Sequence, residues 1–594
     1  PFDFIWSTRG TLYSTDNGAN SSFGPAPQGG VTATSEDQLH LVYGGHYFGH
    51  ANLNRAVDDS RQATWKDEDT AAHNSGKYSA PLALFESSTN GLEEYRATTF
   101  GGALRGELLV QKWKGELFRV KLTPDGRTIE NVVPVPNGPT ALDIVAGPGG
   151  AIVAGELFDC NLANNSCKAK QQIAVVKPND AGAPSTGAYD IFPWRAPAAG
   201  GTPFVIGGVG FGGATSVSIG GLPATVSSVT ATRIKGTIPA NANPTAALLD
   251  VTVTSNGTVS TLTKAFRYLL GKGQGKGVWE TGPAMPEELG EVAGGFINGV
   301  LYLIGDGDTT AASEAVWSLD LVDGLWRQLA ARPFPGDHHA AEIIGDKLYL
   351  FGGIGGGSSK KVQIYDPSTN TWSTGADLPA AQFPNGSGSA STSLINGMVY
   401  FAGGIDPVTN TTTPNGAKYN PVANTWTGIA AMPLNPAQSG AGRNHAAAAT
   451  DGAKFYVFGG RGPGSGDSNV PAPGFADVFV YNPSTNTWAT SFDGSSGIPP
   501  LPQNRGGMGK AAFFNGEFYV IGGETTGNPP GTSMNVYKRV DVYNPTTKTW
   551  RLEADMPTGR HGIFPLVHDT RIYVAGGGVR NGHSHSSILE IFRR

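Results

Sequence analysis

The sequence predicts an all-β protein of several domains, the largest of which is a closed ring of repeated antiparallel sheets. The first observation is composition: of 594 residues, 85 are glycine, 41 are proline and only 15% are charged, against about a quarter charged in an average soluble protein. The second is length, which exceeds what one domain commonly holds. The third is a sequence motif that recurs in the C-terminal half roughly every 50 residues, a spacing typical of propellers.

Each copy of this motif begins with a strand that ends on glycine, and in five of the six copies a second glycine follows directly, as in KLYLFGG at 347–353. Its alternation of aromatic and aliphatic residues predicts a half-buried antiparallel strand. A second strand follows and turns sharply into a tryptophan, as in YDPSTNTW at 365–372, where proline and asparagine favour a turn. One such sheet cannot bury both faces alone, so neighbouring copies are expected to pack around a common axis.

The copies also predict how many blades there are and how the ring closes. The glycine positions are Gly305, Gly352, Gly403, Gly459, Gly522 and Gly576, which predicts six blades. The last copy ends at Arg594 without a tryptophan strand, and such a strand instead precedes the first copy, around Trp279. We therefore expect the Trp279 strand to complete the last blade of a domain spanning 278–594. The glycine pair, tyrosine and tryptophan, recurring in that order, resemble the kelch repeats of β-propellers.

Residues 1–190 are expected to form a different β-rich unit, with strands joined by Asp-Gly, Asn-Gly and Pro-Gly turns. The segments DNG at 16–18, YGGHY at 43–47 and LRG at 104–106 resemble the C-terminal part of the soluble glucose/sorbosone dehydrogenases, which are quinoprotein propellers. The resemblance implies a partial β-propeller, whose remainder is supplied by an upstream segment of the same protein.

The same resemblance implies a cofactor site. It places pyrroloquinoline quinone (PQQ) on a calcium ion held by backbone carbonyls at Gly18 and Ala19, with Lys114 facing the cofactor. Backbone oxygens suit a hard cation. However, the family's histidine base and Arg-Asn pair lie upstream of Pro1, and its later Arg-x-Arg is replaced by TAL at 140–142. We therefore expect no catalytic residue and no cofactor in this chain; calcium and PQQ belong to an alternative hypothesis.

Short strands at about ten-residue spacing predict a β-sandwich over residues 196–269. The segments GT at 201–202, GFG at 210–212, GG at 220–221 and PA at 223–224 and 239–240 resemble the immunoglobulin-like IPT/TIG domain, which implies a spacer or a protein-contact module. The glycine- and lysine-rich stretch at 270–277 is expected to be a flexible linker.

Polar residues recur just before the first strand of each blade. Aligning the copies on their glycines brings the following residues to neighbouring positions: Glu291, His338, His339, Arg443, Asn444, His445, Arg505, Arg560 and His561. Because inner strands begin at the central channel, we expect these side chains to line a funnel that suits a carboxylate or an acidic sugar. The alternative is that they cap strand ends and bind water. His583 and His585 are expected in a surface loop.

The chain has two cysteines, Cys160 and Cys167, which predict a local disulfide in an oxidising compartment. Two further ligands for zinc are not evident. Glycosylation sequons are found at Asn20, Asn164, Asn256, Asn385 and Asn410. These features favour a secreted or cell-surface protein.

Two functional hypotheses remain. A net charge of −6 and a pI near 6.0 argue against nucleic-acid binding, and no transmembrane run is visible. Without a cysteine after Cys167, the kelch ring cannot be a copper-radical oxidase of the galactose oxidase type. The first hypothesis is an extracellular interaction protein that recognises a glycan or a protein. The alternative is a PQQ-dependent sugar dehydrogenase whose N-terminal catalytic half is missing from this chain.

Overall fold

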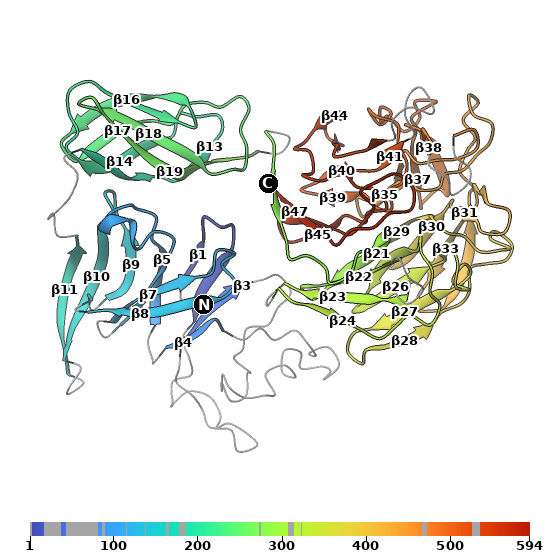
Figure 1. Ribbon diagram of the computed structural model, residues 1–594, viewed down its shortest axis with the longest axis horizontal. Helices are drawn as coiled ribbons and strands as arrows, with labels where there is room; N and C mark the ends of the chain where they lie inside the picture. The colour runs from blue at the N-terminus through green and yellow to red at the C-terminus, as the bar shows by residue number, and fades with distance from the viewer. Residues whose placement is uncertain are drawn as a thin grey trace, which may run out of the picture. The chain divides into compact units, whose positions relative to one another are not determined.

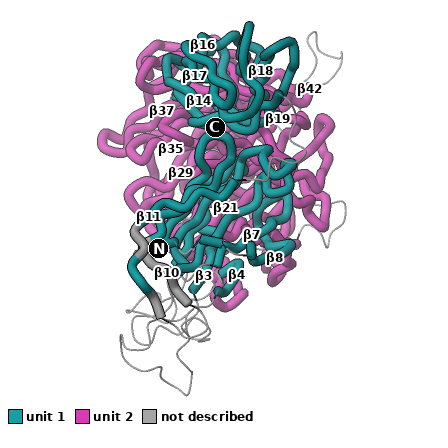
Figure 2. Tube along the Cα trace, turned by 90° about the vertical axis from the view of Figure 1, so that its left-hand side faces the viewer, with its two compact units in different colours: residues 1–276 teal, residues 277–594 magenta. Residues whose placement is uncertain are grey.

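The computed structural model describes residues 3–16, 37–42, 81–85, 89–113, 116–136, 138–139, 141–161, 166–177, 186–271, 275–306, 314–321, 324–465, 472–525 and 535–594. The chain forms two compact units, Pro1–Lys276 and Gly277–Arg594 (Figures 1 and 2). The described residues form β-strands and one 3₁₀ turn, without an α-helix, so the predicted all-β class is confirmed. None of them belongs to a helix long and apolar enough to cross a membrane.

The second unit contains six four-stranded antiparallel sheets within the described residues (Figure 1). The first three blades are β21(Gly290–Ile297)-β22(Val300–Asp306)-β23(Val316–Asp320)-β24(Trp326–Gln328), β25(Ala340–Ile344)-β26(Lys347–Phe351)-β27(Val362–Asp366)-β28(Thr371–Thr374) and β29(Ser391–Ile395)-β30(Met398–Ala402)-β33(Gly416–Asn420)-β34(Thr425–Ile429). The next two are β35(Ala447–Thr450)-β36(Phe455–Phe458)-β37(Val478–Asn482)-β38(Thr487–Thr490) and β39(Ala512–Phe514)-β40(Glu517–Ile521)-β43(Val540–Asn544)-β44(Thr549–Leu552). The sixth is β45(Leu566–His568)-β46(Arg571–Ala575)-β47(Leu589–Arg593)-β20(Val278–Thr281).

The six blades form a closed ring. Their inner strands β21, β25, β29, β35, β39 and β45 contact one another in this order, and β45 contacts β21. In the sixth blade β20 pairs with β47, placing Trp279 opposite Phe592, and the two rings lie 5.2 Å apart. The sheet therefore joins the two ends of the propeller, and the edges that remain are the short outer strands of the blades.

The repeated turn also holds neighbouring blades together. In the second blade the Tyr365 hydroxyl donates to Asn370 Oδ1 at 2.8 Å. The same Oδ1 accepts the N–H of Ala330, just after β24, at 2.9 Å. Trp372 Nε1 donates to the Ala330 carbonyl at 2.9 Å. Asn370 has a φ of 53°, which asparagine tolerates better than most residues. The same contacts recur in the third and fourth blades, through Tyr419, Asn424, Trp426 and Ala376 and through Tyr481, Asn486, Trp488 and Ala430.

The first unit begins with three consecutive antiparallel sheets. They are β1(Asp3–Trp6)-β2(Leu12–Asp16)-β3(Asp37–Val42)-β4(Ala83–Phe85), β5(Thr89–Glu94)-β6(Leu108–Lys112)-β7(Glu116–Leu122)-β8(Ile129–Val135) and β9(Ala141–Ala146)-β10(Ile152–Asn161)-β11(Ser166–Val176). Strand β5 contacts β2 on one side and β9 on the other, so successive sheets pack face to face.

A β-sandwich follows in the same unit. Its strands, in sheet order, are β12(Gly187–Phe192), β14(Pro203–Val209), β17(Arg233–Thr237), β16(Leu222–Thr230), β15(Thr215–Ile219), β18(Leu249–Ser255), β19(Thr258–Leu269) and β13(Arg195–Pro197). The predicted start at residue 196 is corrected, because β12 pairs with β14 and places Ala188 and Ile191 in the sandwich core. Only the first four residues of this strand, 187–190, lie in the range 1–190 assigned to the preceding domain.

Several predicted features can now be located. Cys160 lies directly opposite Cys167 in the β10–β11 hairpin. Asn256 and Asn410 are exposed, whereas the amide of Asn385 donates to Asp406 at 3.0 Å. The predicted positions Gly18, Ala19, Asn20, Lys114 and Asn164 lie outside the described residues.

Candidate functional site

One residue at the start of each blade adopts a left-handed backbone conformation. These residues are Glu291 (φ 40°), His338 (55°), Ser389 (52°), His445 (49°), Gly507 (65°) and Gly562 (56°). Backbone hydrogen bonds connect neighbours: Ser389 N donates to His338 O at 2.9 Å, and His445 N donates to Ser389 O at 3.1 Å. A left-handed conformation costs a non-glycine residue about 1–3 kcal/mol and is found preferentially at functional sites. Four such residues in one ring make it a candidate functional site.

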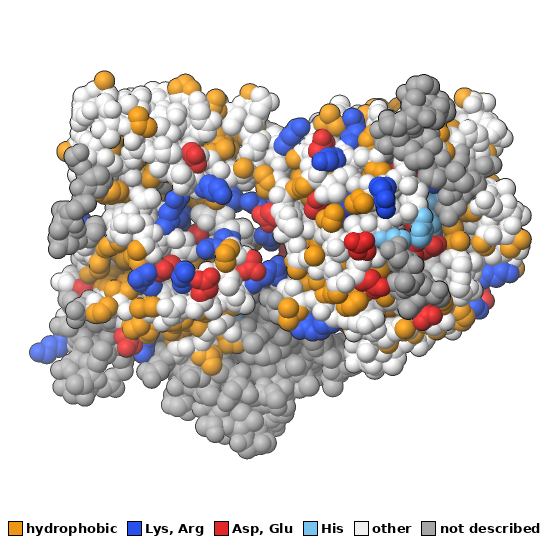
Figure 3. Space-filling model, in the orientation of Figure 1, with side chains coloured by type: hydrophobic (Ala, Val, Ile, Leu, Met, Phe, Trp, Pro, Cys, Tyr) orange, Lys and Arg blue, Asp and Glu red, His pale blue; other side chains and the backbone are white. Residues whose placement is uncertain are grey.

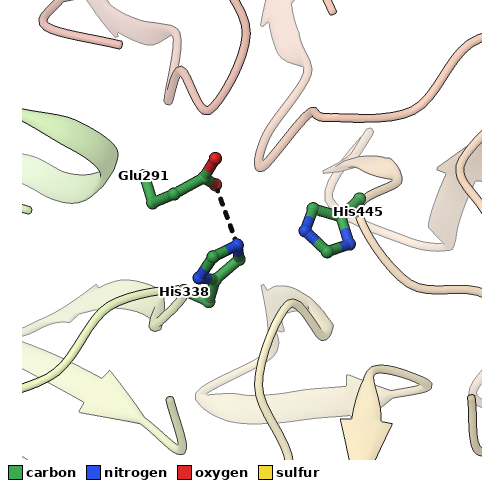
Figure 4. A group of neighbouring side chains, drawn as sticks. All are labelled: Glu291, His338 and His445. Atoms are coloured by element: carbon green, nitrogen blue, oxygen red, sulfur yellow. Dashed lines mark ion pairs between the residues drawn. The ribbon is translucent and has the colours of Figure 1, made fainter. Parts of the chain in front are cut away.

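Three of these side chains point toward one another from three different blades (Figure 4). Glu291 is the second residue of β21, whereas His338 and His445 lie two residues before β25 and β35. The ligand atoms of the three side chains all lie within 4.8 Å of one another. Glu291 Oε2 is 3.3 Å from His338 Nε2, and the two imidazole rings meet edge to face with centroids 4.9 Å apart. We call this group the axial site. It borders a cavity of about 20 Å³, room for one water-sized occupant.

Neighbouring side chains fix the orientation of both histidines. His338 Nδ1 lies 2.7 Å from Asp337 Oδ1, and His445 Nδ1 lies 2.6 Å from Asn444 Oδ1. Because both partners are oxygen acceptors, each Nδ1 carries the proton and each Nε2 faces the axial site. Ser389 Oγ lies 3.2 Å from His445 Nε2. When both Nε2 atoms are unprotonated, this arrangement offers two imidazole nitrogens and one carboxylate to a ligand.

The site combines opposite charges. Burial alone would raise the pKa of Glu291, but the charge of His338 and the hydrogen bond and charge of His561 hold it well below its usual value. Burial likewise opposes protonation of His338, yet Glu291 and Asp337 raise its pKa to about 9. Burial and the charge of Arg461 lower the pKa of His445 well below its usual value. At neutral pH the site therefore holds a carboxylate, an imidazolium and a neutral imidazole.

His561 also reaches the axial site. Its Nδ1 lies 3.4 Å from Glu291 Oε1 and 3.8 Å from Glu524 Oε1, and its Nε2 lies 2.9 Å from the Arg580 carbonyl. Burial lowers its pKa, but the hydrogen bond and charge of Glu291 outweigh burial and raise it. Of the predicted funnel residues, His338, His445 and His561 thus converge with Glu291.

The predicted funnel arginines and His339 form contacts within the blades instead, which corrects the expectation of an arginine-lined funnel. Arg443, Arg505 and Arg560 are at most 1% exposed. Arg505 Nε donates to the Gly522 carbonyl at 2.7 Å, and Arg560 Nη1 donates to the Gly576 carbonyl at 2.7 Å. These guanidinium groups therefore secure the glycine turns that end the second strands.

Each of these arginines is also neutralised by a carboxylate. Arg505 Nη1 lies 2.8 Å from Asp541 Oδ2, Arg560 Nη2 lies 2.7 Å from Glu590 Oε2, and Arg443 pairs with Asp477. His339 has a similar structural role: its Nδ1 lies 2.5 Å from the Gly352 carbonyl, and burial lowers its pKa to about 3. None of the four presents a free charge to a ligand.

A second polar cluster was missed from the sequence. His583 Nε2 lies 2.6 Å from Asp306 Oδ2, and His585 Nε2 lies 3.6 Å from the same oxygen. The side chain of His583 is 66% exposed, as expected of a surface loop, whereas that of His585 is only 5% exposed. In Figure 3 histidine side chains reach the surface of the propeller beside acidic ones. The pairing with Asp306 joins segments far apart in sequence, so no local pattern signals it.

Two larger cavities lie elsewhere. One of about 310 Å³ is bordered by Phe296, Phe513 and the Glu342–Lys510 ion pair of the propeller. Another, of about 470 Å³, lies in the first unit and is lined by several basic side chains and Trp194. In that cavity Arg96 stacks 5.7 Å from the Trp194 ring centre. Neither cavity contains a converging set of ligand atoms like the axial site among the described residues.

Comparison with known families agrees with this architecture. An Attractin/LZTR1 beta-propeller model matches residues 293–529, a Kelch motif matches 507–557, and an IPT/TIG domain matches 188–268. The C-terminal half of the chain is thus a kelch/attractin-type β-propeller, and an IPT/TIG domain precedes it in the middle of the chain.

Individual relatives share the propeller part. The chain is 26% identical over 319 residues to Kelch-like protein terF of Aspergillus terreus, covering 51% of this chain and 64% of that protein. It is 27% identical over 249 residues to Kelch-like protein 25 of Xenopus tropicalis, covering 41% and 37%. Among solved structures, that of YjhT is 20% identical with a TM-score of 0.42, covering 53% of this chain and 100% of YjhT. The chain thus spans less than two thirds of either kelch-like relative.

Proposed function

We propose that this is an extracellular binding protein whose kelch propeller recognises a glycan at the axial site. The observation that carries the proposal is the convergence of Glu291, His338 and His445 from three blades. Sugar hydroxyls both donate and accept hydrogen bonds, so a carboxylate beside an imidazolium offers them complementary partners. Since the cavity holds about 20 Å³, one hydroxyl enters it while the sugar ring lies across the opening.

Features of the first unit support the extracellular location. The asparagine of the sequon at Asn256 is exposed, as a glycosylation site requires. Cys160 and Cys167 are cross-strand partners, a position from which a short-range disulfide forms in an oxidising compartment. In this proposal the sandwich and the N-terminal sheets present the propeller to its ligand.

A glycan array tests the proposal with the full chain. Wild-type protein is compared with Glu291→Gln/His445→Ala, and with Val422→Ser as a control at a side chain that is 96% exposed. We expect a defined glycan class to bind wild type and the control but not the double variant. A blank array for wild type would refute glycan recognition and favour a protein ligand. Equal binding by the double variant would place the glycan away from the axial site.

A further inference from the structure

The arrangement of ligand atoms at the axial site matches that of a metal centre. In a tetrahedral site with metal–ligand distances of about 2.0–2.1 Å, neighbouring ligand atoms lie about 3.3 Å apart. Glu291 Oε2 and His338 Nε2 are already separated by 3.3 Å. His445 completes a set whose atoms all lie within 4.8 Å, so rotations of these side chains bring three ligands onto one ion.

The hydrogen bonds to the Nδ1 atoms of the two histidines are of the kind found at metal sites. A metal-bound histidine usually donates its other ring nitrogen to a carboxylate or a carbonyl oxygen, which fixes the ring. His338 has Asp337 in this position at 2.7 Å, and His445 has the amide oxygen of Asn444 at 2.6 Å. Asn444 is itself held, because its Nδ2 donates to Thr412 Oγ1 at 2.6 Å. Both Nε2 atoms are thereby presented to the same point.

Space for an ion is also present. The cavity of about 20 Å³ is lined by Glu291, His338, His445 and Ser389, and a water-sized volume holds one metal ion or one water. A salt bridge with a purely structural role would not need the third group, His445. The cavity and the oriented Nε2 atoms are therefore two observations that point to an occupant.

We propose that Glu291, His338 and His445 bind one divalent transition-metal ion on the axis of the propeller. Two imidazoles and one carboxylate favour borderline ions such as Zn²⁺, Co²⁺ or Fe²⁺ over Mg²⁺ and Ca²⁺, which prefer all-oxygen sites. The ligands belong to the first, second and fourth blades, so the ion connects separate parts of the inner ring. Three protein ligands leave one coordination position, and with the ion in the cavity a sugar hydroxyl binds at that position instead of entering the cavity itself.

Cobalt titration of the full, chelator-treated chain tests this proposal without any glycan, so it can fail separately from glycan recognition. We expect one Co²⁺ per chain at the axial site, with the visible absorption of tetrahedral or five-coordinate cobalt, and displacement by Zn²⁺. Glu291→Gln/His445→Ala should lose binding at least 100-fold. Asn444→Ala, which removes the amide oxygen beside His445 Nδ1 and leaves the three ligands in place, should lose 10–100-fold.

The second histidine cluster provides the matched control. His583→Ala/His585→Ala also changes two side chains, removing both imidazoles beside Asp306, and should keep the cobalt spectrum of the axial site. Hydrogen exchange of the inner strands verifies that each variant is folded. Loss of the spectrum only in His583→Ala/His585→Ala would assign the metal to that cluster and overturn the proposal. Absence of stoichiometric binding to wild type would overturn it as well.

Discussion

Replacing Trp279 by alanine tests whether the first strand of the propeller holds the last blade. Trp279 lies on β20, stacks 5.2 Å from Phe592 on β47 and donates from Nε1 to the Ala554 carbonyl at 2.9 Å. Trp426 occupies the corresponding place in the third blade and donates to the Ala376 carbonyl at 2.9 Å. Because no chain end interrupts the third blade, Trp426→Ala is the matched control.

The structure sets the expected loss of stability. Removing a fully buried tryptophan side chain costs about 3–5 kcal/mol, and a hydrogen bond contributes about 1 kcal/mol within such values. Trp279 and Trp426 are both only half-buried, so about 2–3 kcal/mol is expected for either substitution. Both variants lose a hydrogen bond to a backbone carbonyl of the preceding blade. Trp426→Ala should lose at least as much stability as Trp279→Ala, because Trp426 contacts the rings of Phe351, Phe401 and Tyr419.

Native-state hydrogen exchange of the full chain measures the effect blade by blade. In Trp279→Ala the free energy of opening should fall for amides of β46 and β47, whereas in Trp426→Ala it should fall for β30 and β33. Unchanged protection of β47 in Trp279→Ala, together with the expected loss in Trp426→Ala, would show that β20 does not hold the ring closed.

Three further predictions concern single contacts. Arg560→Met should destabilise the propeller by about 3–5 kcal/mol in urea unfolding, because it leaves buried Glu590 unpaired. Arg560→Met/Glu590→Leu should recover at least half of this loss. No recovery would mean that the unpaired carboxylate is not the cause. Mass spectrometry of the unreduced protein should find Cys160 linked to Cys167, and free thiols would contradict the disulfide. Burial lowers the pKa of His568 below 6.5, so below that pH the unfolded chain takes up a proton that the folded state resists, and stability falls. His568→Phe should therefore weaken the decline in the urea midpoint between about pH 6.5 and 5, and an unchanged decline would refute this contribution.

Sequence reasoning predicted the ring of sheets because each blade repeats the same local chemistry. The alternating strand residues, the glycine pair and the turn into tryptophan all lie within about 50 residues of one another. Their pattern can therefore be recognised from the sequence without a structure. The predicted start of the sandwich was too late, because β12 belongs to the sandwich only through its pairing with β14. Its own residues resemble those of the preceding strands, and only tertiary contacts decide to which core they belong.

The sequence alone determined that polar side chains gather at the starts of the blades, but tertiary structure decided which of them meet. His338 and His339 are adjacent in sequence, yet His338 faces the axis and His339 bonds to Gly352 inside its blade. A left-handed φ of 55° at His338 directs its side chain toward the axis. Arg505, from another repeat, has the same structural role as His339 because its guanidinium reaches Gly522. Residue type and spacing do not specify side-chain direction, since that depends on the local backbone and on neighbours that only the closed ring supplies.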